Sequence, residues 1–324
     1  MSTTVSVGVF VRSMPHHRLR FYELLREELE AAGVEWRLYA GRLRGKAASK
    51  KDTIQIEWAT EVENLTWRIG SREIYYQPCV CRAIKVDLAI VIQESKLVFN
   101  YILVVLRFLK LTKVAYWGHG KSFKGQTASR MGEAVKRFMS RHVDWWFAYN
   151  SRSKSIVADL GFPVDRITVV DNAIDTRRLR GLRKSISGER LDALRANLGI
   201  SGEHVCLYAG SLYEEKKLDL LMEALLLVRS RLPDFSMIVV GAGPNSEDIT
   251  TFAQDHRWLV QLEPQYGQDL VELFGLAKLL LIPGAIGLSA LDSFAWETPL
   301  VPTREQAHGP EIDYLETGVN AMVV

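Results

Sequence analysis

Residues 204–221 read HVCLYAGSLYEEKKLDLL and combine a strand pattern with a helix pattern. Residues 204–210 form a nearly continuous apolar run, which is typical of a parallel strand buried on both faces. A glycine and a polar loop follow, and residues 218–232 then repeat apolar side chains at helical spacing. Strand, loop and helix in this order predict one unit of a doubly wound α/β fold.

The same order recurs on both sides of this stretch. In the second half we predict a helix at 289–296 and further strands at 235–240, 279–283, 300–301 and 321–324. In the first half we predict a helix from about 21 to near Gly33, a helix at 97–109, and strands at 5–11, 34–39, 87–92, 113–117, 145–149 and 167–170. The sequence therefore predicts two tandem Rossmann-like domains, 1–172 and 204–324. A polar linker, 173–203, with one helix near 190–198, joins them.

Charge is distributed unevenly between the halves. Residues 1–172 carry 27 Lys and Arg against 17 Asp and Glu, whereas residues 173–324 carry 14 against 21. A basic half can face an anionic membrane, a phosphorylated acceptor or only solvent. Its basic residues are scattered and not interleaved with aromatic ones, which argues against nucleic acid as a partner.

Cysteines and apolar runs indicate the compartment. The three cysteines, Cys79, Cys81 and Cys206, form no CxxC pair and no metal-ligand spacing, and the N-terminus has no signal-peptide pattern. The longest apolar stretch, 97–111, falls short of the roughly 20 residues of a membrane span and is expected to be a buried helix. We predict a cytoplasmic protein. The basic run Arg42, Arg44, Lys46, Lys50 and Lys51 adds the hypothesis of peripheral contact with the anionic inner face of the membrane.

The loop after the strand 204–210 has features of a phosphate site. Gly210 at the strand end would let a ligand approach the backbone, and Ser211 follows it. Lys216 stands just before a predicted helix, where the helix dipole favours anions, so a phosphate between the lysine and the helix would explain its position. An exposed lysine in a charged turn is the alternative interpretation.

A second strand-loop-helix segment, IPGAIGLSALDSFAWETPLV at 282–301, has the same geometry. Backbone N–H groups at the start of a helix can hold a pyrophosphate. We expect this role for the loop residues Gly284, Ile286, Gly287, Leu288 and Ser289. Asp292, one turn into the helix, would then reach a ribose hydroxyl.

Together these segments resemble the C-terminal domain of retaining nucleotide-sugar glycosyltransferases of the two-Rossmann (GT-B) type, family 4. That family carries a G-R-L-x-x-E-K-G segment and a later E-G-F-G-L-P-x-x-E-A-x-A-x-G-x-P-V segment. Further matches lie at 171–175, 240–244 and 309–312. The resemblance covers about residues 140–324, and the first half only in architecture. It implies a donor site in a cleft between the two domains.

The resemblance also implies an activity and its partners. A member transfers a sugar from a nucleotide-sugar donor to a glycan or lipid-linked acceptor hydroxyl with retention, and we expect no metal or other cofactor. Lys216 and the loop amides would stabilise charge on the leaving diphosphate. His119 corresponds to a strand-end histidine near the donor sugar. The loop after the first strand would face the acceptor through Arg12, His16, His17 and Arg18.

Several positions depart from the family pattern, and four of them bear on the site. Ser211 replaces an arginine, Gly284 replaces the first glutamate, Asp292 replaces the second glutamate, and Glu297 replaces a glycine. These departures keep two alternatives open, a non-catalytic nucleotide-sugar-binding protein and a nucleotide-sugar epimerase on the same fold. Members of the family continue beyond the last strand with further helices, so we expect the second domain to lack its last helices.

Overall fold

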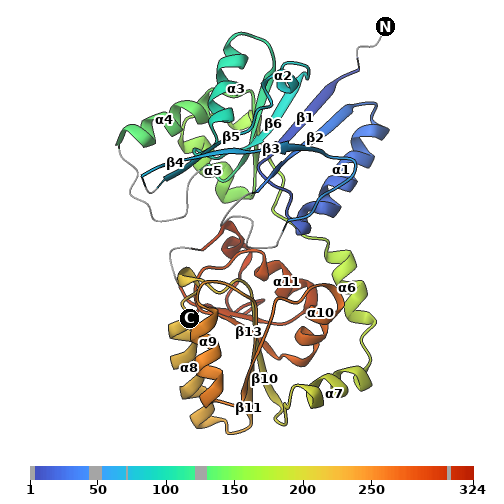
Figure 1. Ribbon diagram of the computed structural model, residues 1–324, viewed down its shortest axis with the longest axis vertical. Coiled ribbons are helices and arrows are strands. Elements are labelled where there is room, and N and C mark those ends of the chain that lie inside the picture. Colours follow the sequence, from blue (N-terminus) through green and yellow to red (C-terminus); the bar gives the residue numbers. More distant parts are fainter. Residues whose placement is uncertain (1–3, 44–52, 71, 121–129, 305–307) are drawn as a thin grey trace. The chain divides into compact units, whose positions relative to one another are not determined.

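The computed structural model describes residues 4–43, 53–70, 72–120, 130–304 and 308–324. The chain divides into two compact units, 1–172 and 173–324 (Figure 1). Each unit is built around a parallel sheet with helices on both faces.

The sheet of the first unit has seven parallel strands in the order β3-β2-β1-β6-β7-β8-β9. These are β1 (Ser6–Val11), β2 (Glu35–Arg42), β3 (Thr60–Glu63), β6 (Leu88–Ile92), β7 (Lys113–Gly118), β8 (Trp145–Ala148) and β9 (Ile167–Val169). An antiparallel hairpin of β4 (Leu65–Ile69) and β5 (Arg72–Tyr76) stands apart from this sheet. The strand order reverses between β1 and β6, so their carboxyl ends mark the position where such sheets bind ligands.

Both faces of this sheet are covered, because successive side chains of a strand point to opposite sides. Val9 packs in one core cluster with Tyr22 of α1 (Leu19–Ala31). Phe10 packs on the other face, 5.2 Å between ring centroids from Phe99 of α3 (Val98–Phe108). The remaining helices of the unit are α2 (Val80–Ala83), α4 (Arg130–Arg141) and α5 (Ser151–Asp159).

Helix α3 is not the fully buried helix that its composition predicts. Phe99 and Leu103 are fully buried, yet Val105 is 56% exposed and Phe108 is 54% exposed. Leu109, at the end of the helix, is 62% exposed. A run that is apolar on every side carries no signal of which side will face solvent, so the sequence could not reveal this exposed face. Across the described residues, none of the helices is long and apolar enough to cross a membrane.

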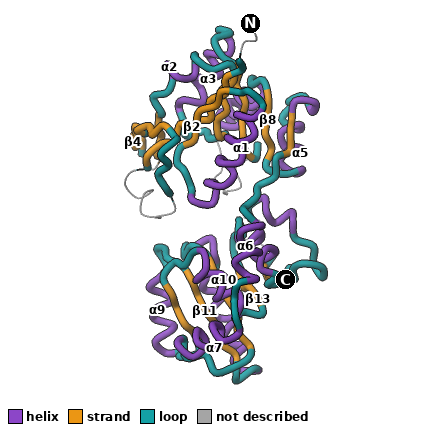
Figure 2. Tube along the Cα trace, turned by 90° about the vertical axis from the view of Figure 1, so that its right-hand side faces the viewer, coloured by secondary structure: helices purple, strands orange, loops and turns teal. Residues whose placement is uncertain are grey.

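The second unit has five parallel strands in the order β12-β11-β10-β13-β14. They are β10 (His204–Ala209), β11 (Phe235–Val240), β12 (Leu259–Leu262), β13 (Leu279–Ile282) and β14 (Leu300–Pro302). Helices α8 (Leu218–Arg231) and α9 (Ser246–Asp255) lie on one side of this sheet, and α10 (Gly267–Leu276) and α11 (Ser289–Trp296) on the other (Figures 1 and 2). One continuous core joins both faces to the strands.

The segment 173–203 holds two helices, where the sequence predicted one. They are α6 (Thr176–Lys184) and α7 (Gly188–Asn197), and each begins at a capping side chain, Asp175 and Ser187 respectively. Leu179 and Leu191 pack against the core of the second unit. Their apolar side chains are spread among many arginines, which conceals the helical period.

Most of the strands and helices that were predicted agree with the structure to within a few residues, but the last predicted strand differs and several elements were missed. The predicted strand 321–324 is reduced to a bridge at Ala321, which pairs with Leu300. The backbone still follows β14, because Met322 N donates to Leu300 O at 3.0 Å. Further elements that were not predicted are α2, α4, α5, α9, α10, β3, β4, β5 and β12.

Candidate functional site

The strand order of the second unit reverses between β10 and β13, which lie side by side. The helices that follow them, α8 and α11, pack on opposite faces of the sheet. Loops that diverge in this way leave a crevice at the carboxyl ends of the two strands. The candidate donor site therefore consists of loop 210–217 and loop 283–288, with the first turns of α11.

Lys216 joins these two loops. Its side chain is buried, with 7% exposed, and its ammonium group donates a hydrogen bond to the carbonyl of Ala285. Burial lowers the pKa of the Lys216 ammonium to about 8, although the carboxylates of Glu311 and Glu215 oppose this. The structure thus brings Lys216 to the loop after β13. Its positive charge lies in a partly desolvated position.

Gly284 lies against the backbone of the same lysine loop. A Cβ atom at this position would overlap the carbonyl oxygen of Glu215 and the carbonyl carbon of Lys216. Ala285 N also donates to the Glu215 carbonyl at 2.8 Å, which holds the two loops together. The contact explains why glycine stands where the resembled family has glutamate, because no side chain fits here.

The amino end of α11 presents backbone donors. Among the described residues, no acceptor is found for the amides of Gly287, Leu288 and Ser289. The hydroxyl of Ser289 is buried and also has no hydrogen-bond partner there. A buried hydroxyl without a partner, next to unpaired amides at a helix N-terminus, fits an anion. The amide of Ile286, predicted as a further donor, is engaged instead and donates to Nδ1 of His308 at 3.3 Å.

His308 was not predicted, and it positions the loop after β13. Its Nε2 lies 2.9 Å from the carbonyl of Thr303, so the ring bridges the amide of Ile286 and the segment after β14. Gly309 N adds a 2.8 Å bond to the carbonyl of Ile286. A neutral imidazole that donates from Nε2 and accepts at Nδ1 satisfies both contacts. A lone histidine near the end of the sequence carries no signal of this role.

Asp292 lies one turn into α11, on the same side as Ser289. Its side chain is half-buried, and the described residues supply no hydrogen bond to its carboxylate. Burial raises the pKa of the Asp292 carboxyl to about 7. A desolvated carboxyl group without a protein donor is costly, and a ligand hydroxyl would relieve that cost.

The other end of the lysine loop contains Gly210 and Ser211. Ser211 is exposed at the end of β10, and its carbonyl accepts a 3.0 Å hydrogen bond from the hydroxyl of Tyr208. The next strand packs closely here, since a Cβ atom at Gly241 would overlap the carbonyl oxygen of Gly210. Ser211 therefore stands at the strand end, where the family has arginine, but it supplies no positive charge.

Two further family glycines correspond to charged residues with left-handed backbone. Lys217, at the last position of the G-R-L-x-x-E-K-G pattern, has φ +54°. Glu297, at the end of α11, also has φ +54°, and its carboxylate pairs with Arg183 at 2.6 Å. Glycine adopts this conformation without strain, which explains the family preference at both positions.

In the first unit, Arg18 lies among aromatic rings at the carboxyl end of the sheet. Its guanidinium is 5.0 Å from the ring of Trp117 and 5.3 Å from that of Tyr149, and it donates to Asn172 Oδ1 at 2.8 Å. The ring of His119 is 4.3 Å from that of Tyr149. Burial and the charge of Arg18 lower the pKa of His119 to about 4, so the imidazole is neutral at pH 7.

Arg12 belongs to a second cluster at this edge. Its guanidinium lies 4.1 Å over the ring of Tyr75, and the Tyr75 hydroxyl donates to the carboxylate of Glu94. Tyr75 belongs to the unpredicted hairpin, whereas Glu94 follows β6 and could have been noticed as a strand-end residue.

The two predicted acceptor-side histidines differ from each other in exposure. His16 is exposed, and its ring lies 5.7 Å from that of His17. Burial and the neighbouring charges of Arg18 and His16 lower the pKa of His17 to about 4.

The basic run of the first half is described only in part. Arg42 pairs with Glu61 at 2.5 Å. The other members of the run, Arg44, Lys46, Lys50 and Lys51, lie outside the described residues.

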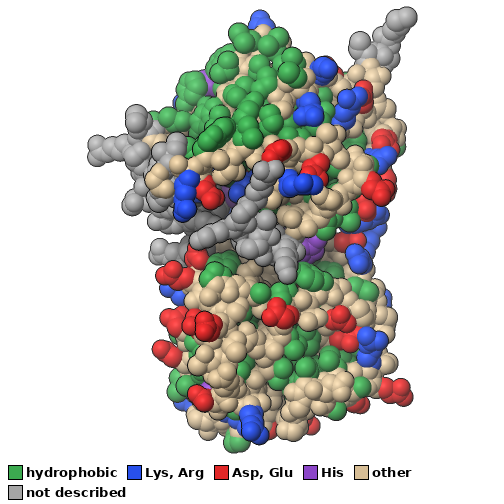
Figure 3. Space-filling view, viewed as in Figure 1, with side chains coloured by type: hydrophobic (Ala, Val, Ile, Leu, Met, Phe, Trp, Pro, Cys, Tyr) green, Lys and Arg blue, Asp and Glu red, His purple; other side chains and the backbone are tan. Residues whose placement is uncertain are grey.

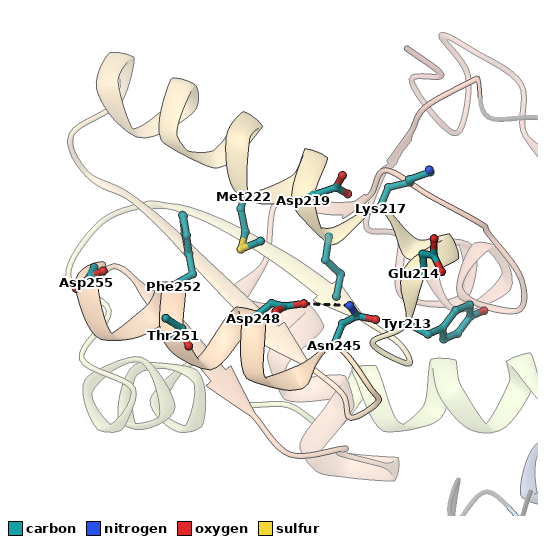
Figure 4. A pocket seen from close by; sticks show the side chains of 11 residues that line it. Tyr213, Glu214, Lys217, Asp219, Met222, Asn245, Asp248, Thr251, Phe252 and Asp255 are labelled. Carbon is teal, nitrogen blue, oxygen red and sulfur yellow. Dashed lines mark hydrogen bonds between the residues drawn. The ribbon is translucent and has the colours of Figure 1, made fainter. Parts of the chain in front are cut away.

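A separate pocket of about 640 Å³ lies between α8 and α9 (Figure 4). Four carboxylates line it, those of Glu214, Asp219, Asp248 and Asp255. Lys217 is the cation in its lining. This acidic lining is unsuited to a diphosphate, so the pocket is not the candidate nucleotide site. Among the described residues, no group of three His, Cys, Asp or Glu side chains is placed to hold a metal ion.

Comparison with known proteins agrees with this geometry. Residues 203–324 match the sequence model of the family "Glycosyl transferases group 1". A D-inositol 3-phosphate glycosyltransferase from Saccharomonospora viridis is 28% identical over 165 residues, which cover 43% of this chain and 35% of that protein. The match thus spans about a third of that relative. The resemblance to group 1 glycosyltransferases is confirmed on the second unit.

Solved structures share the fold of the whole chain. HepE from Anabaena, in complex with UDP-glucose, has a TM-score of 0.67 at 15% identity, with 98% of this chain and 85% of that chain covered. A glycosyltransferase from Rickettsia africae has a TM-score of 0.67 at 13% identity, with coverages of 99% and 84%. A UDP-GlcNAc 2-epimerase from Methanocaldococcus jannaschii has a TM-score of 0.61 at 14% identity, with coverages of 99% and 89%. The two-Rossmann fold is therefore confirmed.

Proposed function

We propose that this chain, whose residues 203–324 match the group 1 glycosyltransferases, transfers a sugar from a nucleotide-sugar donor to an acceptor hydroxyl. One observation carries the proposal. Among the described residues, the amino end of α11 combines three amides without a protein acceptor, those of Gly287, Leu288 and Ser289, with the unpartnered carboxylate of Asp292 one turn later. The amides are suited to bind the diphosphate of a nucleotide sugar, and the carboxylate is suited to bind its ribose.

The arrangement suits the departure of a nucleoside diphosphate. As the bond between sugar and phosphate breaks, negative charge grows on the leaving phosphate. Preorganised amides at the helix N-terminus stabilise that charge, and so does Lys216 on the adjoining loop. We propose that Lys216 supplies the cationic contribution, since Ser211 stands where the family has arginine. Asp292 would position the nucleotide by accepting hydrogen bonds from ribose hydroxyls.

The first unit supplies the proposed sugar and acceptor contacts. His119 is neutral at pH 7, so it would act as a hydrogen-bond donor or acceptor and not as a cation. Arg12 and Arg18 keep their guanidinium groups at the carboxyl edge of the sheet, where they would attract an acceptor that carries phosphate or another anion. Retention of configuration and independence of metals are part of the proposal on the strength of the family resemblance.

Nucleotide binding is the first test. Titration calorimetry with UDP and GDP compares the wild type with Asp292→Ala and, as a matched control, Asp219→Ala in the acidic pocket. We expect Asp292→Ala to weaken binding about tenfold, which corresponds to the loss of one hydrogen bond to a charged group, and Asp219→Ala to leave it unchanged. Equal affinity in all three proteins would contradict the ribose assignment.

Turnover distinguishes the alternatives on this fold. The protein is incubated with a panel of nucleotide sugars, with and without candidate acceptors, and the products are identified by mass spectrometry. A transferase needs the acceptor for product formation. An epimerase, which the fold of the Methanocaldococcus jannaschii enzyme keeps as a second candidate, converts the donor without an acceptor. Nucleotide binding with no conversion of any donor would favour a non-catalytic binding protein.

A further inference from the structure

The outer side of α3 forms an apolar surface in the first unit. Val105, Phe108 and Leu109 are 56%, 54% and 62% exposed, and Leu111 in the following loop is 49% exposed. Figure 3 shows hydrophobic side chains gathered over the part of the first unit where Figure 1 labels α3. Single exposed apolar residues are ordinary, but a contiguous group of large ones marks an interaction surface.

The surface continues onto α4. Val135 and Phe138 are 41% and 49% exposed on the outer side of that helix. The ring of His142 connects the two helices, because its centroid is 4.0 Å from that of Phe138 and 5.4 Å from that of Phe108. We call the exposed side chains of 105–111 and 135–142 the α3–α4 face.

Basic residues predominate around the α3–α4 face, although Glu133 belongs to α4 and Asp144 follows that helix. Segments 98–113 and 134–143 contain no Asp or Glu, and they contain six basic residues: Arg107, Lys110, Lys113, Lys136, Arg137 and Arg141. Arg107 is engaged by the carboxylate of Asp144 at 2.9 Å. On α4, Arg137 and Arg141 are exposed and lie one turn apart beside Phe138. The face therefore has an apolar centre and a basic rim.

We propose that the α3–α4 face docks on the surface of an anionic lipid bilayer. Exposed Phe, Leu and Val side chains would enter the boundary between headgroups and acyl chains, while the lysines and arginines face anionic headgroups. Lys and Arg side chains are attracted to anionic headgroups, and Leu and Phe side chains gain from leaving water. Both contributions act on the same face, which distinguishes it from a merely solvated basic surface.

Vesicle sedimentation tests the proposal with the 324-residue chain. The chain is mixed with vesicles of phosphatidylcholine alone or with one-third phosphatidylglycerol, without nucleotide. We expect the wild type to bind the anionic vesicles at least tenfold more strongly than the neutral ones. Phe108→Ser/Leu109→Ser should lower the partition coefficient at least about tenfold. Lys110→Gln/Arg137→Gln should lower it on anionic vesicles only.

Control variants guard against unfolding and non-specific apolar effects. Leu226→Ser/Leu227→Ser removes two exposed leucines, 45% and 66% exposed, from α8 of the second unit and should leave binding unchanged. All variants should keep the melting temperature of the wild type, since every substituted side chain is exposed.

Absence of wild-type binding, or equal binding by the Phe108→Ser/Leu109→Ser variant, overturns the proposal. A dimer in sedimentation equilibrium that this variant disperses would also overturn it, because a second copy would then cover the face. The assay omits the donor, so its failure leaves the proposed transferase activity untouched.

Discussion

The ammonium group of Lys216 donates a hydrogen bond to the backbone carbonyl of Ala285, although the two residues lie 69 positions apart in the sequence. This contact ties the loop after β10 to the loop after β13. A ligand phosphate at the amino end of α11 would therefore meet a lysine that is already ordered. Ordering before binding lowers the entropic cost of electrostatic stabilisation.

Replacing Lys216 with Met should reduce kcat/KM for the transfer reaction by about 10²–10³-fold, as the loss of one preorganised donor to a developing oxyanion does. Lys217→Met is the matched control, because the neighbouring lysine is exposed. It should change the rate by no more than about twofold. Steady-state kinetics on both variants checks this. Equal losses in the two would show that general positive charge, and not the position of Lys216, is responsible.

Donor binding should also weaken at alkaline pH. Burial lowers the pKa of Lys216 to about 8, so above that pH the free protein loses the ammonium charge that would attract phosphate. We expect the affinity for UDP or GDP to fall between pH 7 and pH 9.5 in the wild type. In Lys216→Met the affinity should be lower and should not fall over the same range, because the remaining ionisable group of the site, Asp292, has a pKa of about 7 and only becomes more fully ionised. Calorimetry at the two pH values measures both, and an equal pH dependence in the variant would contradict the assignment.

Asp292→Asn should raise stability at pH 8 while it weakens nucleotide binding. The folded-state pKa of Asp292 is about 7, above the unfolded value of 3.8. Between about pH 4 and pH 7 the folded protein thus retains a proton that the unfolded chain has lost, and stability falls as pH rises. Removing the ionisable group should gain on the order of 2 kcal/mol at pH 8, about half of the full effect because the side chain is only half-buried.

Urea unfolding at two pH values checks this change. At pH 4 the variant and the wild type should have similar free energies of unfolding, because the wild-type carboxyl is then protonated in the folded state. A gain of the same size at both pH values would mean that hydrogen bonding of the amide, and not ionisation, is the cause. A residue that costs stability in the free protein is typical of a binding site.

Gly284→Ala should destabilise the second unit, because the added Cβ would overlap the backbone of Glu215 and Lys216. Overpacking of this kind costs about 1–3 kcal/mol. Gly287→Ala is the control in the same loop, since a Cβ there meets nothing within 4 Å. Denaturant unfolding should separate the two variants clearly. For the same reason, Gly284→Glu should not restore the family carboxylate; it should yield an unstable protein.

Sequence patterns predicted the parts of the fold that depend on local periodicity. The strand 204–210 and the helix 218–232 agree with β10 and α8, because a nearly continuous apolar run and a run of apolar residues at helical spacing are each easy to recognise. The predicted positions of Lys216, Ser289 and Asp292 on strand-end loops and on α11 follow from the same pattern.

Other features depend on contacts between distant segments. The bridge of His308 to Ile286 and the bond of Tyr75 to Glu94 join residues whose proximity no local pattern encodes. The sequence also does not show which side of α3 is exposed, because apolar residues occupy every side of this helix. Left-handed backbone is recognised in sequence by glycine, so its presence at Lys217 could not be seen there.

Glu297 presents the same left-handed conformation, with φ +54° at the end of α11, and it allows a last prediction. A residue with a Cβ pays about 1 kcal/mol in this conformation, which glycine avoids. The ion pair with Arg183 offsets little of this, because the Glu297 side chain is 74% exposed. Glu297→Gly should therefore raise the free energy of unfolding by about 1 kcal/mol, even though it removes an ion pair. Arg183→Gln breaks the pair while leaving the backbone strain, so it should be neutral or slightly destabilising. Thermal and urea unfolding of both variants measure these changes in stability. If Glu297→Gly loses as much stability as Arg183→Gln, the ion pair, and not the backbone conformation, determines the stability at the end of this helix.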